Sequence, residues 1–290
     1  MGRTFQRVVR VTAGPRGTLN AARVFGNTSA GDPGHHVGFA SRSGDNGQAS
    51  ECDLVIYNLS DESVGLFEDP QNVVKIQVGY RDYAGWRETP VLRTMFAGNP
   101  HPPTLRYAKT GGDWQLTVTI RDGGHAIDYG RVDVSFSTET TVSQIIDEVV
   151  RQSGLSRGVI DLNDVQKFRR FMFSGPARDA VSLLVSSAGK GRSWFVRDGA
   201  IYAMKKTAAT PEQALVISSE KGNLLEAPSR LEEGGVEFRA LIDASVRVGR
   251  VVKVESKRTP AGFYRVIAIE FKGDNFGGDF SMKIKAVKRG

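Results

Sequence analysis

Alternation of apolar and polar residues with a period of two recurs along most of this chain. In Trp114–Arg121 every second residue is apolar, and the residues between are Gln, Thr and Arg. Because successive side chains of a strand point to opposite faces, this pattern predicts a half-buried β-strand. Many short strands separated by turns are typical of a barrel or a sandwich. Further strands are expected at Thr4–Val11, Cys52–Tyr57, Val74–Tyr80, Val91–Ala97, Val132–Phe136, Arg169–Phe173, Leu215–Ser218, Val236–Leu241, Val251–Glu255, Phe263–Phe271 and Phe280–Val287.

Residues 173–206 break this pattern and predict one helix followed by one hairpin. Within Ala177–Ala188, apolar residues recur three and four positions apart, as on the buried face of an amphipathic helix. We expect Ser174 to cap this helix at its N-terminus. The dipeptide Asp198-Gly199 lies between two strand-like runs. A type I′ turn needs positive φ at both central positions, which this pair tolerates, so we expect a β-hairpin here.

Two other helices are expected on either side of the clearest strands. Thr141 and Gln144 have the spacing of a capping box in front of an apolar stripe, and Gly154 ends that stripe. Ser60 precedes a short segment that carries Val64 at an apolar position, which predicts a capped short helix. The order along the chain is therefore β-rich, then mixed α/β, then β-rich again.

Residues 14–47 are rich in turn signals, among them Gly14-Pro15 and Gly31–Gly34. Short strands are expected inside this region at Val24-Phe25 and Val37–Ala40. A stretch of this length without regular elements is more often a functional or interaction loop than a packed one. We therefore expect residues 14–47 to form a long loop-rich segment.

The composition of the chain limits the classes of function that it can have. No apolar run approaches the roughly 20 residues that span a bilayer. Cys52 is the single cysteine, so no intrachain disulfide can form. It lies on a predicted strand face with Leu54 and Ile56, which favours a buried apolar side chain over a catalytic nucleophile. The net charge of +7 is compatible with nucleic-acid binding. The basic residues are scattered, however, so we do not expect that to be the main function.

The sequence holds four histidines: His35, His36, His101 and His125. Their spacing does not match a metal site, which needs three or four converging ligands. Asp122, His125 and Asp128 lie close in sequence, but Asp122-Gly123-Gly124 directly follows a strand, which favours a turn over a catalytic or metal cluster. The chain also lacks a nucleophile elbow and a Walker loop. We expect no catalytic, cofactor-binding or metal-binding residues, and no enzyme activity.

The order of several weak motifs resembles the central hub proteins of phage tails and baseplates, the ring between tail tube and central spike. The resemblance covers about four-fifths of the chain, and residues 14–47 match no part of the pattern. Its specificity lies in the order of the motifs rather than in any one of them. The segments that carry it are VIYNLS at 55–60, VKIQVGY at 74–80, MFAG at 95–98, WQLTVTIRDG at 114–123, and residues 134–155, 173–206, 235–256 and 262–280.

The resemblance implies a mainly β fold with an α+β insert, in which two tube-like β-barrel domains flank a small α/β domain. The expected limits are 1–135 for the first barrel with its long N-terminal loop, 136–210 for the α/β domain and 211–290 for the second barrel. It further implies a homotrimeric, pseudo-sixfold ring that adapts a sixfold tail tube or distal tail protein to a threefold central spike. A tape measure protein is another expected partner. Genome DNA would pass through the lumen without specific binding.

The implied location is the virion, at the baseplate or tip of the tail, after assembly in the host cytoplasm and without membrane insertion. The equivalent hub of a tailocin or of a contractile secretion system is an alternative, because such systems share the ring. A cell-wall hydrolase is another, and it requires two facing carboxylates or a metal cluster. A nucleic-acid-binding barrel requires aromatic residues beside Lys or Arg on one exposed face, whereas most strand aromatics here fall on apolar faces.

Overall fold

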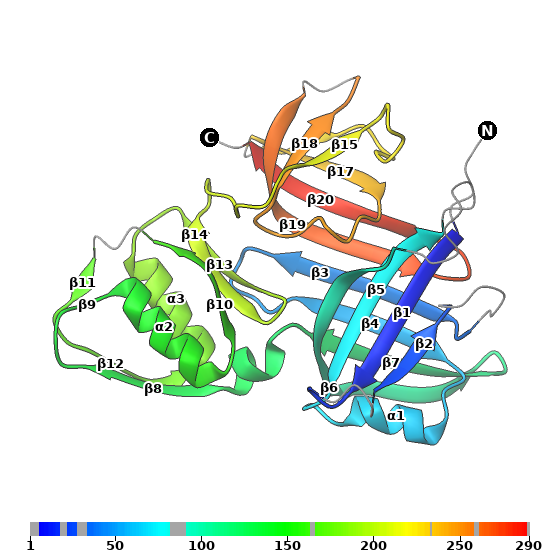
Figure 1. Ribbon diagram of the computed structural model, residues 1–290, viewed down its shortest axis with the longest axis horizontal. Helices are drawn as coiled ribbons and strands as arrows, with labels where there is room; N and C mark the ends of the chain where they lie inside the picture. Colours follow the sequence, from blue (N-terminus) through cyan, green and yellow to red (C-terminus); the bar gives the residue numbers. More distant parts are fainter. Residues whose placement is uncertain are drawn as a thin grey trace.

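The computed structural model describes residues 6–17, 22–27, 34–81, 91–162, 166–232, 234–257 and 261–288. In this part of the chain strands predominate, and the α-helices are α1 (Asp61–Glu68), α2 (Val142–Ser153) and α3 (Ala177–Ser187). No helix in these ranges is both long enough and apolar enough to cross a bilayer. A large β body lies beside a smaller unit that contains α2 and α3 (Figure 1). The predicted mainly β fold with an α+β insert is confirmed.

One continuous sheet runs through the β body (Figure 1). Its strands are β1 (Gln6–Gly14), β2 (Arg23–Gly26), β3 (Val37–Gly44), β4 (Glu51–Tyr57), β5 (Val73–Arg81), β6 (Arg93–Thr110), β7 (Asp113–Arg121), β15 (Leu215–Ser218), β16 (Ser229–Arg230), β17 (Gly235–Leu241), β18 (Val251–Glu255), β19 (Gly262–Asp274) and β20 (Phe280–Lys288). The spatial order is β16-β17-β20-β19-β3-β4-β7-β6-β5-β1-β2, with β18 beside β19 and β15 beside β18.

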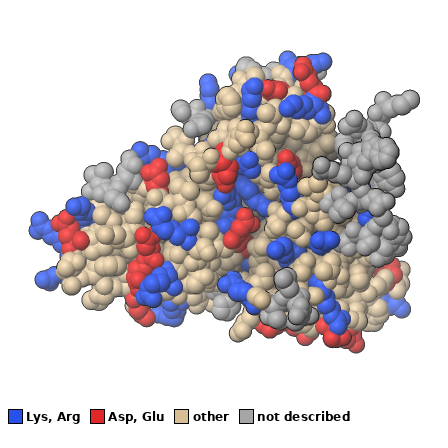
Figure 2. Space-filling model, viewed as in Figure 1, with Lys and Arg blue, Asp and Glu red and all other residues tan. Residues whose placement is uncertain are grey.

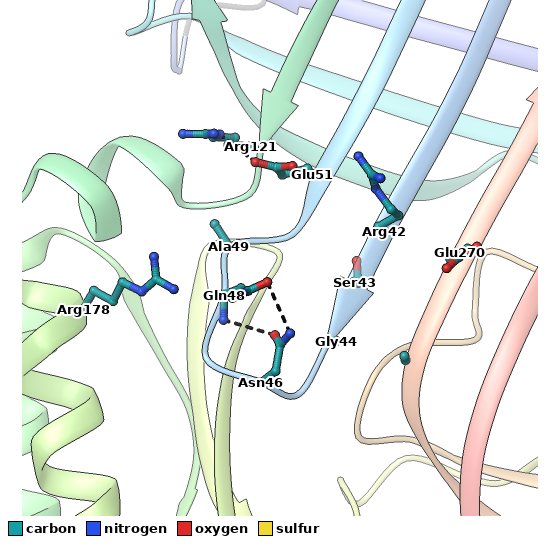
Figure 3. Close-up of a pocket in the computed structure, with 11 residues that line it drawn as sticks. Arg42, Ser43, Gly44, Asn46, Gln48, Ala49, Glu51, Arg121, Arg178 and Glu270 are labelled. Carbon is teal, nitrogen blue, oxygen red and sulfur yellow. Dashed lines mark hydrogen bonds and ion pairs between the residues drawn. The ribbon is translucent and has the colours of Figure 1, made fainter. Parts of the chain in front are cut away.

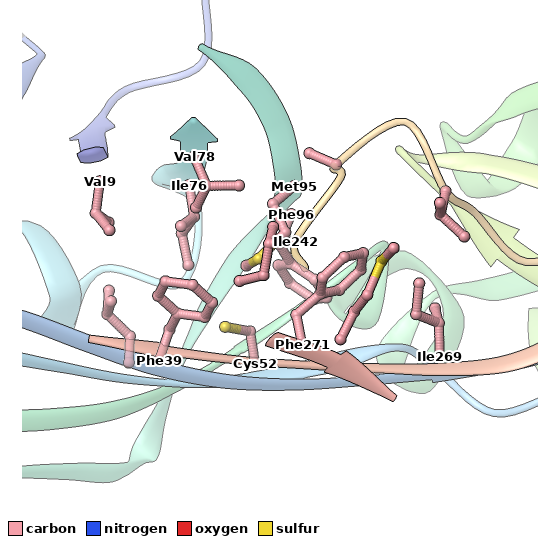
Figure 4. Close-up of a cluster of buried hydrophobic side chains, with 14 of the residues drawn as sticks. Val9, Phe39, Cys52, Ile76, Val78, Met95, Phe96, Ile242, Ile269 and Phe271 are labelled. Carbon is pink, nitrogen blue, oxygen red and sulfur yellow. The ribbon is translucent and has the colours of Figure 1, made fainter. Parts of the chain in front are cut away.

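The sheet curls into two lobes, one made by β1–β7 and one by β15–β20. They join where Ala268–Asp274 of β19 pairs antiparallel with Gly38–Gly44 of β3. On its far side the C-terminal lobe is closed by Leu224, which bridges to Ala240 of β17 and donates its amide to the carbonyl of Ser218 in β15. One hydrophobic core fills both lobes, so that side chains of β3 and β19 meet in it (Figure 4).

The smaller unit has a core of its own. It comprises a π-helical turn, η2 (His125–Tyr129), the helices α2 and α3, and the strands β8 (Arg131–Phe136), β9 (Thr140–Thr141), β10 (Ser156–Asp161), β11 (Lys167–Phe168), β12 (Phe171–Pro176), β13 (Arg192–Arg197) and β14 (Ala200–Lys205). The expected limit between residues 135 and 136 falls inside β8. This strand pairs with β12 along its length, and Val132 and Val134 point into the α/β core.

Most of the helix-capping residues that the sequence predicts in the α/β unit are confirmed. Thr141 caps α2, its hydroxyl accepting from the amide of Gln144 while the Gln144 side chain accepts from the amide of Thr141. Gly154 ends α2 in the left-handed conformation, with φ of 73°. The cap expected at Ser174 is wrong: β12 continues through this residue, and Pro176 occupies the N-cap position without a side-chain cap.

Two N-terminal regions contain more strand than expected. β6 does not end near Gly98 but continues through Pro102 and Pro103. Its pairing with β7 shifts register between His101 and Arg106, so the prolines do not have to donate to the ladder. In the region 14–47, β2 and β3 confirm both expected short strands, and β3 extends to residue 44. Residues 18–21 and 28–33 of that region lie outside the described ranges.

Candidate functional site

The β13–β14 hairpin is shared between the two hydrophobic cores. Phe195 belongs to the core of the β body and stacks on Tyr202, with ring centroids 5.1 Å apart. Trp194 and Val196, its neighbours along the strand, belong to the core under α2 and α3. Since strand side chains alternate between faces, one hairpin can serve both cores at once. The α/β unit is therefore attached to the β body through packing on both sides of this hairpin.

The hairpin turn is held by Asp122, at the end of β7. Asp198 and Gly199 have φ of 53° and 74°, which confirms the predicted type I′ turn. Their amides donate to Asp122 Oδ2 and Oδ1 at 2.7 and 2.8 Å. Asp122 is only 6% exposed, and this burial raises its pKa to about 7 although the two amides oppose the shift. The sequence suggested only a turn here, because nothing local to Asp122 indicates a partner 76 residues away.

Arginine residues add further contacts between the hairpin of the α/β unit and the C-terminal lobe. Arg247 lies with its Nε 3.7 Å from Asp198 Oδ2. Arg197 donates to the carbonyl of Val248 at 3.2 Å and to Glu212 Oε1 at 2.6 Å. The hairpin is thus tied to the end of β7 through Asp122 and to the C-terminal lobe through Arg197 and Arg247.

A buried ion pair lies at the same junction. Arg265 of β19 is fully buried, and its Nη1 donates to Asp45 Oδ2 at 2.6 Å. Ser193 of β13 donates its hydroxyl to the same oxygen at 3.3 Å. Gly47, two residues further along the β3–β4 loop, donates its amide to the carbonyl of Trp194. The β3–β4 loop therefore connects both lobes to the hairpin.

Among the described histidines, His36 contacts an aspartate and an aromatic ring. His36 Nε2 lies 2.7 Å from Asp274 Oδ2, and its ring stacks on Tyr57 at 4.4 Å between centroids. This pairing fixes the start of β3 against the end of β19 and keeps the pKa of Asp274 below its ordinary value. Within the ranges that the structure describes, no three His, Cys, Asp or Glu residues converge on one point. Residues 125 and 128 lie within η2, but the side chains of His125 and Asp128 are not among those that the structure describes.

The outward side of β17, β20, β19, β3, β4 and β7 carries a row of charges that runs from one lobe to the other. Residues of this row lie directly opposite one another on successive strands, in the order Arg239, Lys283, Glu270, Arg42, Glu51, Arg121. Together with Glu237, Lys285, Lys272 and Asp53 on the same side, we name these residues the charged face. Opposite charges on neighbouring strands stabilise each other, whereas like charges repel.

Every basic residue of the charged face contacts a carboxylate. The pairs are Arg42–Asp53 (3.5 Å), Arg121–Glu51 (3.0 Å), Arg239–Glu226 (2.9 Å), Lys272–Asp279 (3.4 Å), Lys283–Glu237 (2.9 Å) and Lys285–Glu237 (3.5 Å). The hydrogen bond from Lys283 helps to hold the pKa of Glu237 below its ordinary value. On the side of the molecule shown in Figure 2, basic and acidic groups are interspersed rather than gathered into areas of one sign.

A polar cleft of about 580 Å³ lies where the charged face meets the α/β unit (Figure 3). Its walls include four residues of the row and, from α3, Arg178, while the β3–β4 loop forms one side with Asn46 and Gln48. Glu51 and Glu270, its two carboxylates, are separated by Arg42 in the strand register rather than facing each other. Glu51 forms an ion pair with Arg121 here, so the cleft does not present two free, facing carboxylates of the kind that a glycosidase uses.

Comparison with solved structures places the fold among tail and secretion-system proteins. The 43 kDa tail protein of prophage MuSo2 from Shewanella oneidensis has a TM-score of 0.60 at 11% identity over 98% of both chains. The E. coli c3393 protein, a component of the type VI secretion system similar in structure to T4 tail proteins gp27 and gp5, has a TM-score of 0.60 at 13% identity over 96% of this chain and 77% of that one. A tail protein from Neisseria meningitidis MC58 has a TM-score of 0.60 at 10% identity over 96% of both chains.

The fold is therefore that of the hub-like proteins at the end of tails and related secretion machines. More narrowly, the chain belongs to the Baseplate hub gp41 family, whose model matches residues 46–286. Comparison with curated proteins gives no match by sequence. The resemblance drawn from the order of motifs is confirmed, and the match begins at the end of the region 14–47 that fitted no hub pattern. The chain is therefore a baseplate hub protein by family, and it shares its fold with a prophage tail protein and with a component of a type VI secretion system.

Proposed function

We propose that three copies of this chain form a ring that adapts a sixfold tail tube or distal tail protein to a threefold central spike. The observation that carries this proposal is the sheet shared by two β lobes of one chain, joined at β19 and β3. Three such chains supply six lobes around one axis while the chain itself repeats three times. A ring of this composition presents pseudo-sixfold symmetry on one side and threefold symmetry on the other.

The three domains of this adaptor are the two lobes and the α/β unit, with the limits 1–135, 136–210 and 211–290 adjusted so that β8 lies with the α/β unit. The tube and the spike are the main partners, and a tape measure protein is a further one. The ring surrounds the channel through which DNA leaves, and the protein works in the virion tail after assembly in the host cytoplasm. Membership of a structural hub family supports this role, and so does the ion pair of Glu51 with Arg121 in the polar cleft, which favours a structural function over a catalytic one.

A hub of a contractile secretion system is the second candidate. It is favoured by the structural similarity to the E. coli c3393 protein, a component of the type VI secretion system. Both candidates require the same ring and differ in what passes through it. The ring itself is therefore the first property to test.

The test is the mass of the purified chain in solution together with negative-stain imaging. We expect a trimer with an open centre, in which each subunit contributes two lobes to the rim. A chain that stays monomeric at high concentration, both alone and when co-expressed with its neighbouring tail genes, would contradict the proposal.

A further inference from the structure

We infer that the charged face is the wall of the passage through the ring, and that its paired charges let a polyanion pass without binding. The inference rests on the proposed ring and assigns one surface of this chain to the nucleic acid that travels through it. It goes further than the ring because it names the strands that face the passage. It also gives their charge pattern a function.

The extent of the charged face supports this assignment. Its six strands, β17, β20, β19, β3, β4 and β7, are consecutive in one sheet and come from both lobes. A wall that continues around a ring of lobes requires a surface that crosses from one lobe to the next without a break, and the β19–β3 join provides it. Of the described helices in the β body, α1 packs against β6 and β1 rather than on this face. The α/β unit meets the face at the polar cleft, where its Arg178 lines the same space as Arg42 and Arg121.

The charge of this face differs from that of the whole chain. The chain carries a net charge of +7. The charged face has six basic residues and four acidic ones, Glu51, Asp53, Glu237 and Glu270. Its border adds the carboxylates Glu226 and Asp279 and the guanidinium of Arg178, which gives seven positive and six negative charges and a net charge of +1. Most of the excess positive charge of the chain therefore lies on other surfaces.

Pairing matters because basic residues bind DNA by neutralising phosphates and releasing counterions. A lysine or arginine that already contacts a carboxylate must give up that contact before it can neutralise a phosphate. The carboxylates also repel the phosphates directly, so a face whose positive and negative charges nearly cancel is hydrated but holds a duplex weakly. This property suits a surface past which a polyanion has to move.

Several exposed apolar side chains lie off the charged face. Examples among the described residues are Met172 on β12, which is 84% exposed, Leu183 on α3 and Tyr129 in η2. Contacts with protein partners gain most from burying apolar side chains. The surfaces that carry these residues are therefore better suited to neighbouring subunits and tail proteins, which leaves the charged face to line open space.

Cysteine labelling of the assembled ring tests the placement. The native Cys52 is fully buried, and burial raises the pKa of its thiol, so engineered cysteines can be labelled selectively. Ala40→Cys introduces a thiol at an exposed position of β3, opposite Lys272 and Asp53 on the charged face. Glu68→Cys, exposed at the end of α1 and away from the charged face, is the matched control.

In the ring we expect both thiols to react with a small maleimide. A maleimide on a long polyethylene glycol chain should react several-fold more slowly at Ala40→Cys than at Glu68→Cys, since the passage restricts its entry. Equal rates with the large reagent in a ring that has formed would overturn the inference and leave the proposed function standing. A failure of the small reagent at Ala40→Cys would place this residue in a protein interface and would also overturn it. If no ring forms, the proposed function falls, and the inference falls with it.

Binding of a short fluorescent DNA duplex to the ring tests the role of the paired charges. The double variant Glu51→Gln with Glu237→Gln releases Arg121, Lys283 and Lys285 from their carboxylates. We expect tighter binding and a steeper dependence on salt, by about 0.9 in the logarithmic slope for each released cation that contacts a phosphate.

The control is the double variant Glu62→Gln with Glu148→Gln. It makes the same change in net charge and releases Arg23 and Arg151, which lie away from the charged face. We expect a smaller gain in affinity from this control, because its cations are not arranged in one row. An equal gain in both double variants would show that only net charge matters and would overturn the role assigned to the pairing.

Discussion

Replacing Asp122 by Asn tests how the α/β unit is held to the β body. In the structure both carboxylate oxygens accept an amide from the hairpin turn, at 2.7 and 2.8 Å. At pH 5 the Asp122 carboxyl is protonated, and both of its oxygens still carry lone pairs that can accept from the turn. An asparagine keeps the shape of the side chain but has one acceptor and one NH₂ group, so one amide of the turn would face a donor that cannot accept. Leaving a buried donor unsatisfied costs about 1–3 kcal/mol. We expect Asp122→Asn to lower the free energy of unfolding by this amount at pH 5.

The effect of Asp122→Asn must then change with pH. The pKa of Asp122 is about 7 in the folded chain, against an ordinary value of 3.8. A carboxyl group whose folded pKa is raised contributes most to stability below its unfolded pKa, and the contribution falls as the pH rises towards the folded pKa. Between pH 5 and pH 8 the wild type should therefore lose about 3 kcal/mol relative to a variant that does not titrate at this position. The stabilities of the two proteins should meet or cross as the pH approaches 8.

Urea unfolding followed by tryptophan fluorescence, in steps from pH 5 to pH 8, measures both quantities. Asp179→Asn, an exposed aspartate in the first turn of α3, is the control, and its difference from the wild type should vary much less over this range. A deficit of Asp122→Asn that stays constant would show that Asp122 does not titrate in this range. A deficit that grows with pH would show that the two amides outweigh burial, and it would refute the reasoning.

Two further substitutions test the same junction. Asp45→Asn removes the charge that pairs with the fully buried Arg265. Because breaking a buried ion pair typically costs about 3–5 kcal/mol, we expect a large fall in the urea midpoint of unfolding. An unchanged midpoint would contradict the structure. Gly47→Ala should destabilise the protein more than Gly154→Ala. Both glycines have positive φ, which an alanine adopts only with strain. A Cβ at position 47 would in addition lie 2.7 Å from Trp194 Nε1, whereas the space around Gly154 is open. Equal losses in the two alanine variants would show that the loop can move away from the hairpin.

Elements set by local chemistry could be predicted from the sequence. Alternation located β7 and β20 because their side chains face a core on one side and solvent on the other. The Thr141 capping box and the Asp198-Gly199 turn were found because each depends on residues next to it. The expected cap at Ser174 failed because pairing with β8 extends β12 to Pro176, and this tertiary contact outweighs the capping preference.

The candidate site could not be predicted because it depends on register between distant strands. Glu270 and Arg42 become neighbours only when β19 pairs with β3, more than 200 residues apart in the chain. Asp122 likewise gains its role only when the hairpin packs beside β7. In the sequence these residues read as ordinary solvated charges, and their grouping into one face needs the complete order of strands. The order of motifs identified the family without locating any of these contacts.

The join between β3 and β19 also has a consequence for synthesis. The ribosome releases β3 early, but the strand that completes its free edge, Ala268–Asp274, is translated almost last. Until then the N-terminal half exposes an unpaired strand edge, which in other proteins invites pairing with the wrong partner. The shared sheet can close only when the chain is nearly complete. A truncated chain therefore cannot form the joined pair of lobes, and only subunits translated through β19 contain the complete shared sheet.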